Sequence, residues 1–137
     1  MTDIGSDKAA ATAQNLVTVV VGGQMKPGHR WSPSVGDETT DLLTHLGLSK
    51  ESAGRLRDEA IDVLARCVPP SSKPDVETGL VVGYVQSGKT MSFTTVASLA
   101  RDNGYRVVIV IAGTSKPLLA QSTARLARDL RIDSDNR

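Results

Sequence analysis

Eight consecutive residues in the second half of the chain have the types and spacing that bind a polyphosphate. They match the phosphate-binding loop pattern GxxxxGK followed by Ser or Thr, and they are Gly83, Tyr84, Val85, Gln86, Ser87, Gly88, Lys89 and Thr90. The two glycines let the backbone curl so that successive N–H groups point at phosphate oxygens. The lysine supplies positive charge for the β- and γ-phosphates, and the threonine hydroxyl is a ligand for Mg²⁺. The loop therefore predicts an ATP and Mg²⁺ site.

The sequence on either side of this loop predicts the elements that must position it. Residues 80–82 form a β-branched apolar run, which is typical of a buried strand. Residues 91–103 have apolar side chains at helical spacing, and Gly104 follows where a helix would end. Residues 106–112 form a second continuous apolar run. The predicted fold class is α/β: an incomplete P-loop (RecA-like) β-α-β unit with parallel strands, preceded by a small helical segment.

The chain divides into three segments by composition. Residues 1–36 are rich in small and polar residues, glycine and proline, so we expect a disordered or loosely ordered segment, in which Trp31 packs onto a neighbouring surface. Residues 37–70 predict two helices, the first capped by Asp37 and the second by Ser49. Residues 71–137 predict the partial P-loop domain.

A last helix is predicted from Ser115 to about Leu130. Its core side is expected to hold six apolar residues: Leu119, Ala120, Ala124, Leu126, Ala127 and Leu130. Gln121, Arg125 and Arg128 share the outer face, where a solvated surface is the alternative to a binding role. We expect the start of this helix to face the loop, which leaves Asp129 roughly 20 Å away from the helix cap. Neither an acid nor an arginine is thus expected beside the phosphates, and the catalytic residues remain unknown.

Composition limits the kinds of partner, metal site and cellular compartment that the sequence supports. The net charge is +1, so no overall basic field indicates a nucleic-acid partner, and any such contact must be local. The single cysteine, Cys67, excludes an internal disulfide and a multi-cysteine metal site, and its place on an apolar helix face predicts a buried structural thiol. No segment reaches the roughly 18 apolar residues of a membrane span. These features indicate a reducing, cytoplasmic setting.

Four segments of the sequence together resemble a known family: residues 79–90, 104–106, 109–114 and 121–130. This region resembles the P-loop region of bacterial putative endonucleases with a Z-one domain, which are superfamily-two helicase-like proteins often found with restriction-modification or phage-defence genes. The resemblance implies that Gly83 to Thr90 are the ATP cradle and that DNA is the partner of the complete protein. It also implies a contact between the nucleic-acid backbone and Thr114, Ser115 and Lys116, for which an ordinary helix cap is the alternative.

Two functions follow from these features. The first is the ATP-binding N-terminal portion of a helicase-like, DNA-acting protein, a putative endonuclease whose complete relatives look like ATP-dependent hydrolases. The alternative is a truncated, non-catalytic interaction fragment with a vestigial P-loop. A small P-loop kinase is disfavoured because no lid or acceptor-site residues follow the loop. Whether the chain is itself an enzyme is left open, and we expect it to be inactive alone.

Overall fold

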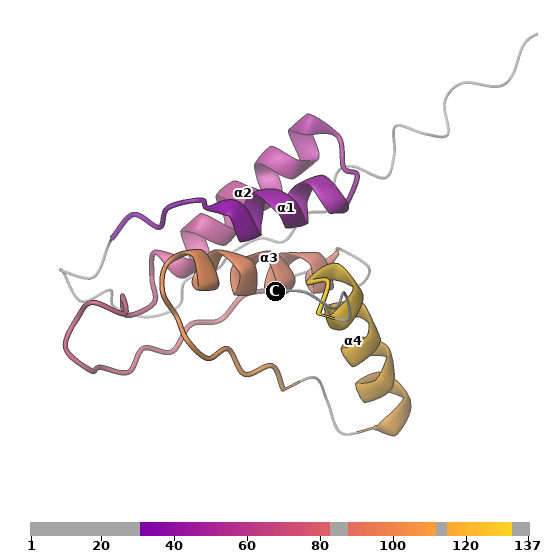
Figure 1. The fold of residues 1–137 in the computed structure, drawn as a ribbon. Helices are drawn as coiled ribbons and strands as arrows, with labels where there is room; N and C mark the ends of the chain where they lie inside the picture. The colour runs from indigo at the N-terminus through magenta and orange to yellow at the C-terminus, as the bar shows by residue number, and fades with distance from the viewer. Residues whose placement is uncertain (1–30, 83–87, 112–114, 133–137) are drawn as a thin grey trace, which may run out of the picture.

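The computed structural model describes residues 31–82, 88–111 and 115–132 of the chain (Figure 1). These residues form four α-helices: α1 (Asp37–His45), α2 (Lys50–Leu64), α3 (Lys89–Asp102) and α4 (Lys116–Asp129). The helix α3 contacts all three others. In Figure 1, α1 and α2 lie together along one side of α3, and the C-terminal end of α4 lies beside the N-terminal end of α3. The site described below is built where α3 begins.

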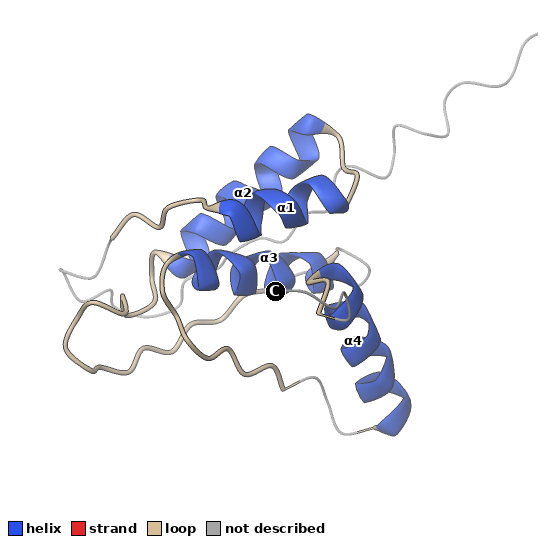
Figure 2. Ribbon diagram, viewed as in Figure 1, coloured by secondary structure: helices blue, strands red, loops and turns tan. Residues whose placement is uncertain are grey.

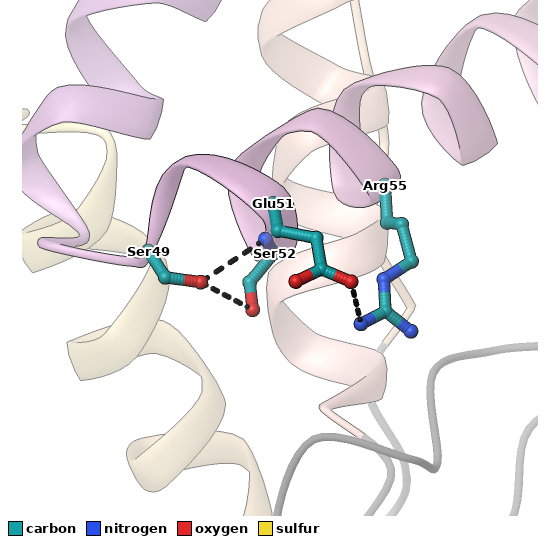
Figure 3. A network of polar contacts seen from close by, with 4 residues as sticks. All are labelled: Ser49, Glu51, Ser52 and Arg55. Carbon is teal, nitrogen blue, oxygen red and sulfur yellow. Dashed lines mark hydrogen bonds and ion pairs between the residues drawn. The ribbon is translucent and has the colours of Figure 1, made fainter.

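The helix α2 begins at the predicted cap. The Ser49 hydroxyl oxygen accepts a hydrogen bond from the backbone N–H of Ser52 at 3.2 Å. One turn on, the Arg55 guanidinium lies 3.1 Å from the Glu51 carboxylate, an i, i+4 pair (Figure 3). Since a helix leaves its first N–H groups without intrahelical acceptors, a serine at this position stabilises the start. The cap predicted at Ser49 is confirmed.

The predicted cap of α1 is wrong. The N-cap residue is Gly36 rather than Asp37, and Gly36 has no side chain that could accept a hydrogen bond. The carboxylate of Asp102, at the end of α3, serves instead. It accepts hydrogen bonds from the backbone N–H groups of Gly36 (2.9 Å), Glu38 (3.1 Å) and Thr39 (3.0 Å). A negative charge at a helix N-terminus also interacts favourably with the helix dipole. Local sequence could not reveal this cap, because its acceptor is distant in the chain.

Arg101 and Asn103, on either side of Asp102, also hold the start of α1 and the segment before it against the end of α3. Arg101 Nε lies 3.2 Å from the Glu38 carboxylate. Asn103 exchanges two hydrogen bonds with the backbone of Ser34, donating to its carbonyl at 2.9 Å and accepting from its N–H at 2.8 Å. Three consecutive side chains at the end of α3 therefore hold the segment that leads into α1.

The buried face of α3 is more polar than its sequence predicts. Leu99 and Ala100 are buried, and so are Thr94, Thr95 and Ser98. The two threonine hydroxyls donate to backbone carbonyls four residues earlier, at 2.7 and 2.8 Å, so their burial leaves no hydroxyl proton without an acceptor. Of the apolar residues at helical spacing, Phe93, Val96, Ala97 and Ala100, the last is buried and the other three are half-buried, with Val96 packed against the core.

The hydrophobic core lies between α2 and α3. Its buried members are Ala60, Leu64, Leu99 and Ala100, and Trp31 packs against them. The indole N–H of Trp31 donates to the carbonyl of Cys67 at 3.0 Å. This arrangement confirms that Trp31 packs onto a neighbouring surface. The sequence predicts one apolar stripe on α2, and three of its members, Leu56, Ala60 and Leu64, are buried. The other predicted members are half-buried, and they are Ala53, Val63 and Cys67.

The predicted parallel β-α-β unit is wrong for the described residues. Figure 2 shows helices and loops there and no strand. The apolar runs at 80–82 and 106–111 are exposed loops, with Ile109 at 80% and Ile111 at 92% exposure. Beta propensity measures how well a side chain fits a pleated, half-buried surface. A pair of parallel strands needs cover on both faces and further strands beside it. Here the second run borders a cavity that it lines together with α3 and Ser122 of α4, so β-branched composition alone does not produce a sheet.

The apolar side predicted for α4 is only partly covered. The helix has the predicted extent, and Asp129 is its buried residue. Of the six predicted core residues, Leu119, Ala120 and Ala124 are exposed, and Leu126, Ala127 and Leu130 are half-buried. The exposed half lacks the sheet that the predicted fold class would have placed against it. The domain boundaries predicted at residues 36 and 70 stay a prediction. None of the four described helices has the length and apolar character of a membrane span.

Candidate functional site

The N-terminus of α3 is where the described part of the predicted phosphate loop lies. Gly88 is the N-cap residue and has a left-handed backbone, with φ of +76°. Lys89 and Thr90 are the first two residues of the helix. The backbone N–H groups of a first helical turn and the helix dipole together favour an anion. The predicted loop residues Gly83, Tyr84, Val85, Gln86 and Ser87 lie outside the described residues.

A cavity of about 550 Å³ opens at this helix start. We call it the α3–α4 cavity. It is lined by residues 88–91, by Leu46, and by Arg125, Arg128 and Asp129 from the last turns of α4. Its volume lies within the range of small-molecule sites. It therefore joins the predicted phosphate-binding residues to the C-terminal end of α4, as the neighbouring ends of the two helices in Figure 1 illustrate.

This geometry corrects the expected direction of α4. The start of that helix was expected to face the loop and to leave Asp129 far away, but the end of α4 lines the cavity. Asp129 is 6% exposed, and its Oδ1 lies 3.1 Å from Arg128 Nε. An acid and two arginines thus line the same cavity as Lys89 and Thr90, where none was expected. The shared helix face of Arg125 and Arg128 was visible in the sequence, but no sequence signal showed which end of α4 reaches α3.

The residues predicted to contact a nucleic-acid backbone lie elsewhere. Ser115 is the N-cap of α4 without a side-chain cap hydrogen bond, and Lys116 is the first residue of the helix. Thr114 lies outside the described residues. A helix of this length separates its ends by roughly 20 Å. The structure therefore does not bring Ser115 and Lys116 to the α3–α4 cavity, and the two predicted sites are separate places on the molecule.

A second, smaller cavity of about 270 Å³ lies between α2 and α3. We call it the α2–α3 cavity. Its lining is mainly apolar, from Ala60, Val63, Val81, Phe93 and Val96, and Glu59, Ser92 and Lys89 complete it. Glu59 Oε2 and Ser92 Oγ are buried atoms without a hydrogen-bond partner. Burial raises the pKa of the Glu59 carboxyl, and the charge of Arg55 partly opposes this rise. Lys89 belongs to the lining of both cavities.

The single cysteine lies apart from both cavities. Cys67 is half-buried against the core, and burial raises the pKa of its thiol. Burial first, and the nearby Cys67 second, also raise the pKa of the Tyr105 hydroxyl. A raised thiol pKa leaves less thiolate at neutral pH, so Cys67 is a poor nucleophile. The prediction of a structural thiol agrees with this packing.

Comparison with known proteins gives no family. The chain matches no protein-family model, no curated protein and no solved structure. The resemblance to helicase-like putative endonucleases stays a prediction. In the described residues, no group of three or more His, Cys, Asp and Glu side chains could hold a metal ion. The functional argument therefore depends on the α3–α4 cavity and its chemistry.

Proposed function

We propose that this chain binds ATP as its magnesium complex, with the phosphates in the α3–α4 cavity. The observation that carries the proposal is the convergence of Lys89 and the N-terminus of α3 with Arg125 and Arg128 of α4 on one cavity. Three cationic side chains and a helix N-terminus surround a space large enough for a triphosphate. Arginine and lysine are the side chains that bind phosphate most strongly, because their hydrogen bonds are charge-assisted.

The single acidic residue of this cavity fits a metal rather than a phosphate. Asp129 offers a buried carboxylate, and Thr90 offers a hydroxyl at the other side of the cavity lining. Mg²⁺ in nucleotide sites uses one or two protein oxygen ligands together with phosphate oxygens and water. Thr90 and Asp129 would hold the ion, and the ion would neutralise part of the phosphate charge. A larger carboxylate cluster is not needed for this role.

The family resemblance extends this proposal to DNA. In a complete helicase-like protein of the restriction or phage-defence type, the nucleotide site would support work on DNA in the cytoplasm. Ser115 and Lys116, at the far end of α4, would then contact the nucleic-acid backbone. The proposal of a DNA partner depends on the family resemblance. The proposal of ATP binding depends on the residues that line the α3–α4 cavity.

One observation favours the second candidate function, an interaction fragment with a vestigial P-loop. The run Val107, Val108, Ile109, Val110 and Ile111 is exposed throughout. Exposed contiguous apolar surface is common where proteins contact each other. The two functions differ in their requirement for the cationic residues of the cavity, so nucleotide binding separates them.

The proposal is tested by comparing ATP and AMP in isothermal titration with Mg²⁺ present. ATP should bind more tightly than AMP, because its β- and γ-phosphates reach the cationic side chains. Arg125→Gln should weaken ATP binding by about fivefold, and AMP binding little, since one charge-assisted contact is lost. Arg57→Gln, on the exposed surface of α2, is the matched control and should leave both affinities unchanged. Equal affinity for ATP and AMP would contradict the proposal. So would an equal loss of ATP affinity in Arg125→Gln and Arg57→Gln.

A further inference from the structure

We propose that the α2–α3 cavity binds the adenine base of the same nucleotide. This inference rests on the proposed function, since it takes the phosphates to occupy the α3–α4 cavity. Lys89 lines both cavities, and the α2–α3 cavity continues along α3 through Ser92, Phe93 and Val96. From Lys89 to Val96 the helix advances about 10 Å. One nucleotide can therefore extend from one cavity to the other along the first two turns of α3.

The lining of the α2–α3 cavity suits a flat, largely apolar ring. Ala60 and Val63 from α2 face Phe93 and Val96 from α3 around a space of about 270 Å³. Small-molecule sites are mostly apolar with a few polar groups that fix the orientation of the ligand. Aromatic side chains offer a surface on which any base can stack. Phe93, the only phenylalanine of the chain, is half-buried at this cavity.

Two buried polar atoms of the same cavity lack partners. Glu59 Oε2 and Ser92 Oγ are both buried without a hydrogen bond. Buried polar atoms are almost always hydrogen-bonded, so an unpartnered pair on one cavity requires an explanation. A ligand with matching donors and acceptors provides one. The unpartnered atoms lie on facing helices, which would place them at different edges of a bound ring.

The polar groups match adenine in particular. Glu59 Oε2 can accept a hydrogen bond whether or not the carboxyl carries a proton, and the exocyclic amino group of adenine is a donor. The Ser92 hydroxyl can donate to or accept from a second ring atom. Hypoxanthine carries an oxygen where adenine carries the amino group, so it offers Glu59 Oε2 no donor at that place.

The test compares three ligands on the full chain: ATP, ITP and inorganic tripolyphosphate, each with Mg²⁺, by isothermal titration. We expect ATP to bind at least tenfold more tightly than tripolyphosphate and about fivefold more tightly than ITP. Val63→Phe, which fills the cavity, should lower ATP affinity to that of tripolyphosphate and leave tripolyphosphate binding unchanged. Val76→Phe is the control at an exposed position outside both cavities. Retained tripolyphosphate binding shows that each variant is folded.

Milder variants keep the inference testable if Val63→Phe disturbs the helices. Glu59→Leu should remove most of the preference for ATP over ITP, and Ser92→Ala should weaken the binding of ATP but not of tripolyphosphate. Equal binding of ATP and tripolyphosphate by the unmodified chain would overturn the base site while leaving phosphate binding intact. Failure of all three ligands to bind would overturn the proposed function and this inference together.

Discussion

Thr90 and Asp129 line the same cavity, although one lies in the first turn of α3 and the other ends α4. The hydroxyl of Thr90 belongs to the predicted phosphate loop, and the carboxylate of Asp129 is 6% exposed. An oxygen pair of this kind is what a magnesium–nucleotide complex needs from a protein. The pairing depends on the end of α4 returning to the start of α3, and it explains why a charged residue is the buried residue of that helix.

Asp129→Asn should remove most of the magnesium dependence of ATP binding. In the unmodified chain, Mg²⁺ is expected to raise ATP affinity about tenfold or more, because the proposed site includes Asp129 as a charged ligand. In the variant, affinities measured with Mg²⁺ and with a chelator should agree within about threefold. Asp62→Asn, exposed on α2, is the matched control. A full magnesium effect in Asp129→Asn would show that the carboxylate holds no metal.

Asp102→Ala should destabilise the fold by about 2–3 kcal/mol. The substitution removes the carboxylate that accepts hydrogen bonds from Gly36, Glu38 and Thr39, and leaves the start of α1 without its acceptor. Asp102→Asn keeps one acceptor oxygen, so its free energy of unfolding should lie between those of the unmodified chain and Asp102→Ala. Urea denaturation followed by helical circular dichroism measures the free energy of unfolding, with Asp62→Ala as control. A change below about 0.5 kcal/mol, the usual size for a surface substitution, would contradict this role.

Gly88→Ala and Gly54→Ala should have opposite effects on the free energy of unfolding. Gly88 has a φ of +76°, and an added Cβ would lie 2.9 Å from the Met91 methyl group. The left-handed backbone alone costs a residue with a side chain about 1–2 kcal/mol. Gly54 lies inside α2 with open space around its Cβ position, so alanine should stabilise by about 0.5–1 kcal/mol. Thermal melts of both variants give the signs, and stabilisation by Gly88→Ala would contradict a left-handed backbone at this helix start.

Replacing Ile109 and Ile111 by threonine should lower binding of a hydrophobic dye without loss of stability. These side chains are 80% and 92% exposed, so they contribute little to the core. Leu99→Ala, at a fully buried position, is the contrasting variant and should cost about 2–5 kcal/mol. Dye fluorescence and the unfolding midpoint are read on the same samples. A destabilisation of more than about 1 kcal/mol in the double threonine variant would mean that the run at 106–111 is packed.

Helix positions followed from local sequence because their signals are local. Ser49 before an apolar i, i+3, i+4 stripe predicts α2, and Ser115 with Pro117 predicts the start of α4. The predicted strands were wrong because the signals that make a strand are not local. A β-branched run such as 107–111 has no structure of its own until other strands and a second layer cover it, and those partners are not encoded within the run.

The residues of the candidate site likewise differ in whether local sequence could predict them. Gly88, Lys89 and Thr90 were proposed from their spacing, since a phosphate loop is a continuous stretch of chain. Arg128 and Asp129 were missed because their place depends on the direction in which α4 returns. The two buried atoms Glu59 Oε2 and Ser92 Oγ could not be found from sequence at all, because their burial arises from the packing of α2 on α3.

The most direct test of nucleotide binding compares two lysines in the same structural position. Lys89 is the first residue of α3 and lines both cavities, while Lys50 is the first residue of α2 and lines neither of the two cavities described above. Titration calorimetry with Mg²⁺ and ATP should show that Lys89→Ala lowers affinity about 30-fold or more, or about 2 kcal/mol, through loss of a charge-assisted phosphate contact. Lys50→Ala should bind ATP as the unmodified chain does. Equal ATP affinity in the unmodified chain and Lys89→Ala would contradict the assignment of this helix start as a phosphate site.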